Sequence, residues 1–142
     1  MIPTLTQLLA EIEDGEIPLA DIFGTADCDS LLDRRDSDSA FDKNYREIWE
    51  RNEKLKFILN RDWTEPVRKQ SFLTVSKATE QHEIASCVSE DFELIAWESL
   101  ALVDKANSNS GTPFVEWLYS QYKSGNFPCP PYSDGNPNGN GG

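Results

Sequence analysis

The sequence lacks any long apolar run. No stretch approaches the roughly 20 consecutive apolar residues that a membrane-spanning helix needs. Residues 1–16, MIPTLTQLLAEIEDGE, contain acidic residues where a secretory signal has basic ones. These two absences predict a cytoplasmic protein that does not contact a membrane.

Histidine and cysteine are scarce. The 142 residues include one histidine, His82, and three cysteines, Cys28, Cys87 and Cys129. An odd number of cysteines without a CxxC pair argues against a disulfide framework and against structural zinc. Helical zinc and di-metal sites need paired histidine motifs, which one histidine does not supply. We therefore expect reduced thiols, no bound metal and no cofactor, with His82 at the surface or at the edge of the core.

The usual catalytic motifs are also absent. There is no Gly-x-Ser-x-Gly turn and no glycine-rich loop before a helix. Cys87 follows His82 by five residues, which places the two about 140° apart around a helix. The 25 acidic residues form many pairs, but none has flanking apolar residues that would raise one pKa for acid–base chemistry. We expect a protein that is not an enzyme. The alternative is a small enzyme whose Cys-His or carboxylate site forms only in the tertiary fold.

One acidic segment partly matches a calcium-binding loop. Counting from Asp36, acidic residues occupy positions 1, 3 and 12 of a twelve-residue loop that ends at Glu47. Position 5 is Ala40, which has no ligating atom, and position 6 is Phe41, where the loop needs glycine. The segment is therefore interpreted as an acidic helix start without a metal.

Basic residues are too few to balance the acidic ones. The formal net charge is -12 and the isoelectric point is near 4.4. Residues 11–42 hold eleven acidic residues and only two arginines. A surface of this sign repels nucleic acid and anionic membranes and favours a basic protein partner. The predicted contact residues in this segment are Asp27, Asp29, Asp33, Asp36 and Asp38.

Apolar residues recur at three- and four-residue steps, without a convincing alternating strand pattern. The pattern predicts an all-α fold, an irregular bundle with about four principal helices. These helices span residues 39–59, 65–88, 90–105 and 113–124. Asp38 or Ser39 is expected to cap the first, and Ser89 the third. A short amphipathic helix and a second short apolar piece precede them, and Thr25 to Ser39 is expected to be a loop with at most one helical turn.

The C-terminal residues differ in composition from the rest. Residues 128–142 are rich in proline, glycine and asparagine and have no core-forming pattern. The sequence therefore predicts one helical domain over residues 1–127, with a partly irregular acidic segment at 11–42. Residues 128–142 are expected to form a flexible, disordered tail.

Aromatic residues supply a second candidate contact surface. Trp49 and Trp97 fit apolar stripes and are expected in the core, whereas Trp63 lies in a break and is a candidate surface anchor. Trp117, Tyr119 and Tyr122 face different sides of one short helix, so part of this set is expected to be exposed for a partner.

These patterns favour a non-catalytic cytosolic module for interaction or regulation that binds a basic protein through its acidic surface. An alternative is an inhibitor or immunity-type protein whose carboxylates mimic the phosphates of nucleic acid. Direct binding of nucleic acid is not expected under either interpretation.

Overall fold

The structure is a computed structural model that describes residues 2–24, 27–55, 61–104 and 112–132. Its elements are α1 (Leu5–Glu13), α2 (Leu19–Ile22), α3 (Cys28–Asp36), α4 (Ser39–Leu55), the 3-10 turn η1 (Arg61–Trp63), α5 (Glu65–Thr79), α6 (His82–Asp104) and α7 (Pro113–Lys123). These ranges contain no strand, and the predicted all-α class is confirmed.

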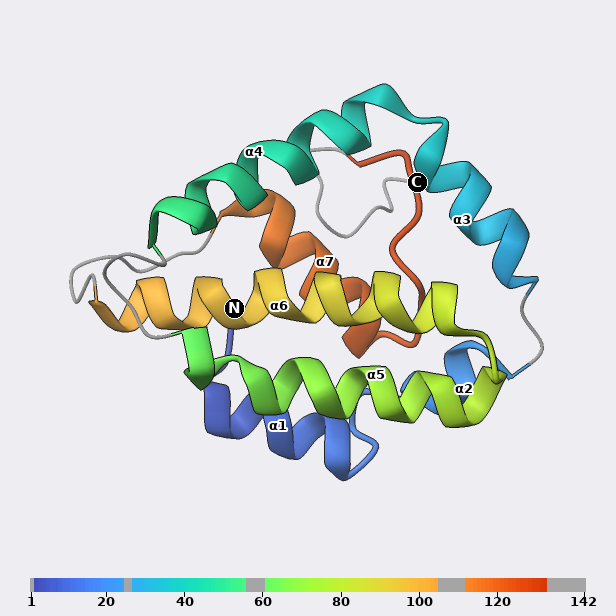
Figure 1. The fold of residues 1–142 in the computed structure, drawn as a ribbon, viewed down its shortest axis with the longest axis horizontal. Coiled ribbons are helices and arrows are strands. Elements are labelled where there is room, and N and C mark those ends of the chain that lie inside the picture. Colours follow the sequence, from blue (N-terminus) through green and yellow to red (C-terminus); the bar gives the residue numbers. More distant parts are fainter. Residues whose placement is uncertain (1, 25–26, 56–60, 105–111, 133–142) are drawn as a thin grey trace.

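The antiparallel pair α5 and α6 lies at the centre of the bundle, with α1 and α2 against α5 and α7 against α6 (Figure 1). Helices α3 and α4 follow each other along the opposite side, where both contact α6. Thus α6 touches helices from every part of the chain.

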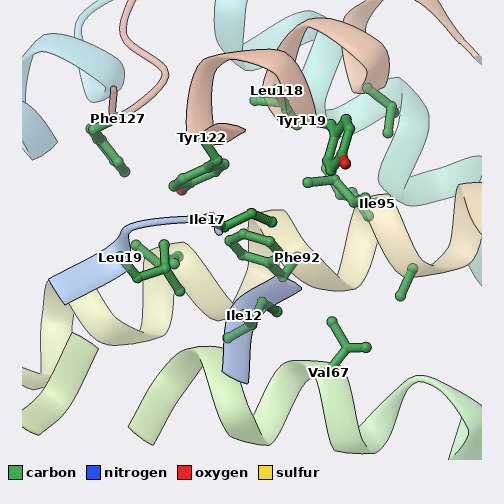
Figure 2. Packing of buried hydrophobic residues seen from close by; sticks show 14 of the residues in the cluster. Ile12, Ile17, Leu19, Val67, Phe92, Ile95, Leu118, Tyr119, Tyr122 and Phe127 are labelled. Atoms are coloured by element: carbon green, nitrogen blue, oxygen red, sulfur yellow. The ribbon is translucent and has the colours of Figure 1, made fainter. Parts of the chain in front are cut away.

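The middle of α6 forms the core of the molecule. Every side chain from Asp91 to Leu100 is buried. Figure 2 shows Phe92 of α6 among Ile12 and Ile17 from the N-terminal segment and Tyr122 of α7. Apolar residues occur on all faces of this part of α6, which accounts for its burial around most of its circumference. None of the described helices is long and apolar enough to cross a membrane.

The boundary between α5 and α6 differs from the predicted one. The sequence predicted a break after Val88 and a new helix capped by Ser89, but α6 already begins at His82. The chain turns at Glu80, whose backbone is left-handed with a φ of 57°. Ser89 instead donates its hydroxyl to the carbonyl of Ser86, one turn earlier in the same helix. The predicted ranges 65–88 and 90–105 are therefore wrong at their junction.

Helix α3 was not predicted. Residues 25–39 were expected to be a loop, but Cys28–Asp36 is helical. Asp27 caps the helix, since its carboxylate accepts the backbone N–H of Ser30. Few apolar residues mark this helix in the sequence, and the charged side chain of Arg35 is one of its attachments to the body.

The other helix predictions agree better with the structure. Asp38 accepts the backbone N–H of Phe41 at 2.8 Å and so caps α4, as expected. Helix α4 was predicted to end at residue 59, and residues 56–60 lie outside the described ranges. The predicted short helices at the N-terminus are present, and the predicted helix 113–124 is confirmed as α7 within one residue.

The start of the predicted flexible tail packs on the body. Pro128 and Pro130 are buried, and the carbonyl of Pro130 accepts a hydrogen bond from Arg34. The ring of Tyr132 lies 5.0 Å from that of Phe114 and 5.1 Å from that of Trp117. Residues 128–132 therefore belong to the folded unit, whereas 133–142 lie outside the described ranges.

Candidate functional site

An acidic groove of about 710 Å³ lies between α3 and the first turns of α6. Five exposed carboxylates line it, and no lysine or arginine does. They are Asp29, Asp33 and Asp36 from α3 and Glu83 and Glu90 from α6. Residues three and four apart share one face of a helix, so each helix presents its acids in a row. We call this feature the acidic groove.

A buried ion pair fixes α3 beside α6. Arg35, on the inner side of α3, donates to both carboxylate oxygens of Asp91 at 2.8 and 2.9 Å. Its guanidinium also lies 4.4 Å from the ring centre of Phe41 and 4.9 Å from that of Phe127. Paired charges and stacked rings together compensate for taking a guanidinium out of water.

Asp91 also accepts hydrogen bonds from two further helices. Tyr45 of α4 donates its hydroxyl to Asp91 at 2.9 Å, and Tyr122 of α7 donates a short hydrogen bond to the other oxygen. Burial and the Asp91 charge raise the pKa of both tyrosines well above the ordinary value, so both remain hydrogen donors. Burial alone would lower the pKa of Arg35, but Asp91 outweighs it and raises that pKa. The four side chains form a charged network inside the molecule.

His82 and Cys87 line the same groove, although helical geometry predicted that they point apart. Burial, reinforced by the Asp91 charge, raises the pKa of the Cys87 thiol to about 12. A thiol protonated at neutral pH is a poor nucleophile. His82 is exposed and stacks on Phe72, with ring centres 6.1 Å apart. The described residues contain no cluster of histidine, cysteine and carboxylate side chains that fits a metal ion.

Glu90 lies close to other carboxylates. Burial, together with the charges of Asp91 and Glu93, raises its pKa above the ordinary glutamate value. A carboxylate in a cleft whose pKa is perturbed by burial and by neighbouring charges is a candidate for a functional site.

The structure separates the five predicted aspartates into two groups. Asp29, Asp33 and Asp36 line the acidic groove. Asp27 and Asp38 cap α3 and α4 instead, and hydrogen bonds from Ser30 lower the pKa of Asp27. Three of the predicted contact residues are thus brought together, and two have a local structural role.

The predicted aromatic surface is wrong, because Trp117, Tyr119 and Tyr122 are all buried. Trp117 packs against Phe41, Tyr119 donates its hydroxyl to Glu11 at 2.6 Å, and Tyr122 bonds to Asp91. Helix α7 is covered by helices on several sides. The sequence of one short segment does not show this burial. Of the other tryptophans, Trp97 is buried as predicted, and Trp63 is exposed over 54% of its surface.

Sequence reasoning missed Glu83 and Glu90, which lie far outside the 11–42 segment. Their seven-residue spacing places them on one face of α6 and was visible in the sequence. Only the packing of α3 beside that face makes them part of one site.

Comparison with known proteins adds one finding to this geometry. A family model described as Immunity protein PIM1 matches residues 7–129. The chain belongs to this immunity protein family. The matched range covers most of α1 and all of α2 to α7, and therefore the whole acidic groove. No curated protein and no solved structure matches the chain significantly.

Proposed function

We propose that this chain is a non-catalytic immunity protein that neutralises a protein toxin by binding a basic surface of it in the acidic groove. The observation that carries the proposal is the groove itself, with five exposed carboxylates and no lysine or arginine in its lining. Membership of the immunity protein family supports a protein as the partner. Pairs of colicin nucleases with their immunity proteins are among the tightest protein complexes known.

The charge distribution suits rapid association with a basic partner. Opposite potentials on two proteins steer their encounter and raise the association rate. The groove is preformed, because Arg35 and Asp91 fix α3 at its edge. A preformed surface loses little conformational entropy on binding, so more of the contact energy appears as affinity.

The lining of the groove does not favour catalysis or a small ligand. Ligand pockets are mostly apolar with a few placed polar groups, whereas five carboxylates dominate here. The raised pKa of Cys87 argues against a cysteine nucleophile paired with His82. A binding role accounts for these features without a reaction.

Mimicry of nucleic acid is a more specific form of this function. Two facing rows of carboxylates, one on α3 and one on α6, present repeated negative charge along helix faces. A toxin that binds nucleic acid offers a basic cleft for such rows. If the partner is of this class, a DNA or RNA duplex should compete with the chain for it.

The proposal is tested by affinity capture from cells that naturally produce the protein. Three columns carry the parent chain, a groove variant (Asp29→Asn, Asp33→Asn and Asp36→Asn) and a control variant (Glu13→Gln, Asp14→Asn and Glu16→Gln). The control changes net charge equally at exposed acids near the end of α1. We expect one basic protein on the parent and control columns, eluted by high salt, and little of it on the groove variant. Equal capture by all three columns would contradict the proposal.

A further inference from the structure

A small pocket opens on α5 next to the acidic groove. Its volume is about 240 Å³, and it is lined by Glu65, Arg68, Lys69, Phe72, Leu73 and Ser89. Leu73 is exposed over 43% of its surface. Among the described residues, only Leu73 and Trp63 are large hydrophobic side chains with this degree of exposure. We call this feature the α5 pocket.

The α5 pocket and the acidic groove are neighbouring surfaces. His82 lines the groove and stacks on Phe72, which lines the pocket, with an angle of 11° between the ring planes. Ser86 of α6 faces the groove, and Ser89, about one turn later, faces the pocket. A protein that covers both the groove and the first turns of α6 would therefore also reach the pocket.

The charges around the pocket differ from those of the groove. Arg68 is paired with Glu65 at 3.0 Å and lies 3.8 Å from Glu93. Lys69 is exposed and makes no ion pair within the described ranges. The pocket thus combines apolar surface from Phe72 and Leu73 with charged side chains of both signs around it, and a protein interface likewise has an apolar centre inside a polar rim.

The size of the pocket also limits its occupant. Small-molecule sites usually enclose about 300–1,000 Å³, and this pocket is smaller and open. Apolar anchors of a protein partner commonly fill pockets of this kind at the centre of an interface.

We infer that the α5 pocket receives a large apolar side chain of the same protein partner whose basic surface covers the acidic groove. The inference rests on the proposed function and gives the acidic groove and the α5 pocket different roles in binding. Charges at the groove act mainly on the association rate, whereas a buried apolar anchor acts mainly on the dissociation rate.

The test measures binding kinetics of the full chain with the purified basic protein recovered from the parent column. Leu73→Ala removes the apolar wall of the pocket, and Trp63→Ala is the matched control. Trp63 lies in η1, before α5 begins, and does not line the pocket. Leu73→Ala should accelerate dissociation about fivefold or more, the effect of an interface residue worth over 1 kcal/mol. The association rate and its salt dependence should not change, and Trp63→Ala should behave as the parent.

Thermal unfolding of both variants shows whether the fold is kept, which is expected for exposed positions. Unchanged dissociation of Leu73→Ala would overturn the inference, and so would equal acceleration by Trp63→Ala. In either case, slower association of the groove variant still supports the proposed function. Conversely, a groove variant that associates as fast as its charge-matched control contradicts the proposed function, whatever Leu73→Ala does.

Discussion

Asp91 accepts hydrogen bonds from side chains of three different helices, and one of them is a guanidinium with the opposite charge. Both members of this ion pair are buried, with exposed fractions of 7% for Arg35 and 0% for Asp91. Such a pair adds little stability compared with an apolar pair of the same size, but removal of one member leaves a buried charge. The main role of the Arg35–Asp91 pair is to fix the position of α3 at the edge of the acidic groove.

Arg35→Met should therefore lower the free energy of unfolding by about 3–5 kcal/mol. The double variant Arg35→Met with Asp91→Leu should lose less than the single one, since no charge is then left unpaired. Urea unfolding of the three proteins measures both differences. A loss below about 1 kcal/mol for Arg35→Met would show that the network does not hold the helix.

The charge of Glu90 affects both the stability of the fold and the proposed binding of a partner. Its pKa is raised in the folded chain, so the charged form destabilises the fold above that pKa, and the effect disappears as pH falls below the ordinary glutamate value. Glu90→Gln should raise stability at pH 7, by up to about 0.5 kcal/mol at this exposed position. This gain in stability should vanish near pH 4. Glu90→Gln should also associate with the partner more slowly than the parent chain does. Thermal unfolding at the two pH values checks the sign, and a gain that grows toward pH 4 would contradict it.

Neither Arg35 nor Asp91 was marked by the sequence. Arg35 follows another arginine among aspartates, and Asp91 follows Glu90 after a serine, which resembles a helix start. Pairing between residues 56 positions apart depends on the tertiary fold. A local pattern therefore does not reveal this ion pair.

At the scale of elements, the junction of α5 and α6 shows why local patterns mislead. Both the true junction and the predicted one contain polar residues, but only Glu80 adopts a left-handed backbone. Thr79 stabilises this turn, because its hydroxyl donates to the carbonyl of Val75 and accepts the N–H of Gln81. Helices usually end on glycine at such a position, and glutamate there carries a conformational cost.

Glu80→Gly should consequently raise the free energy of unfolding by up to about 1 kcal/mol, since glycine adopts this conformation without strain. A control, Glu83→Gly, places glycine in the first turn of α6 and should destabilise the protein by about 0.5–1 kcal/mol. Chemical denaturation of both variants gives the comparison. A destabilising effect of Glu80→Gly would mean that the left-handed turn is not populated.

For the whole molecule, apolar periodicity in the sequence predicted the all-α class, the short N-terminal helices and α7. It did not predict the site. Asp29, Asp33 and Asp36 were predicted as contact residues from charge density alone. Their partners in the groove, Glu83 and Glu90, belong to a helix more than 40 residues later in the chain. Charge density in the sequence therefore located three of the five groove carboxylates, and only the packing of the helices located the other two.

The C-terminal residues provide a further test at this scale. A variant that ends at Tyr132 should keep the thermal stability of the full chain, because residues 133–142 offer almost no apolar surface to bury. A variant that ends at Asn126 should lose several degrees, since it lacks Phe127 and Tyr132, which pack on the core. Equal unfolding temperatures for the two variants would contradict the packing described for residues 128–132.

The association rate with the basic partner, followed from low to high salt, tests the central claim most directly. The parent and the Glu13→Gln, Asp14→Asn and Glu16→Gln control should both associate rapidly at low salt and slow steeply as salt increases. The groove variant, Asp29→Asn, Asp33→Asn and Asp36→Asn, should associate more slowly and with a much weaker dependence on salt, although its net charge equals that of the control. Identical rates and salt dependences for the two variants would show that the acidic groove does not bind the partner.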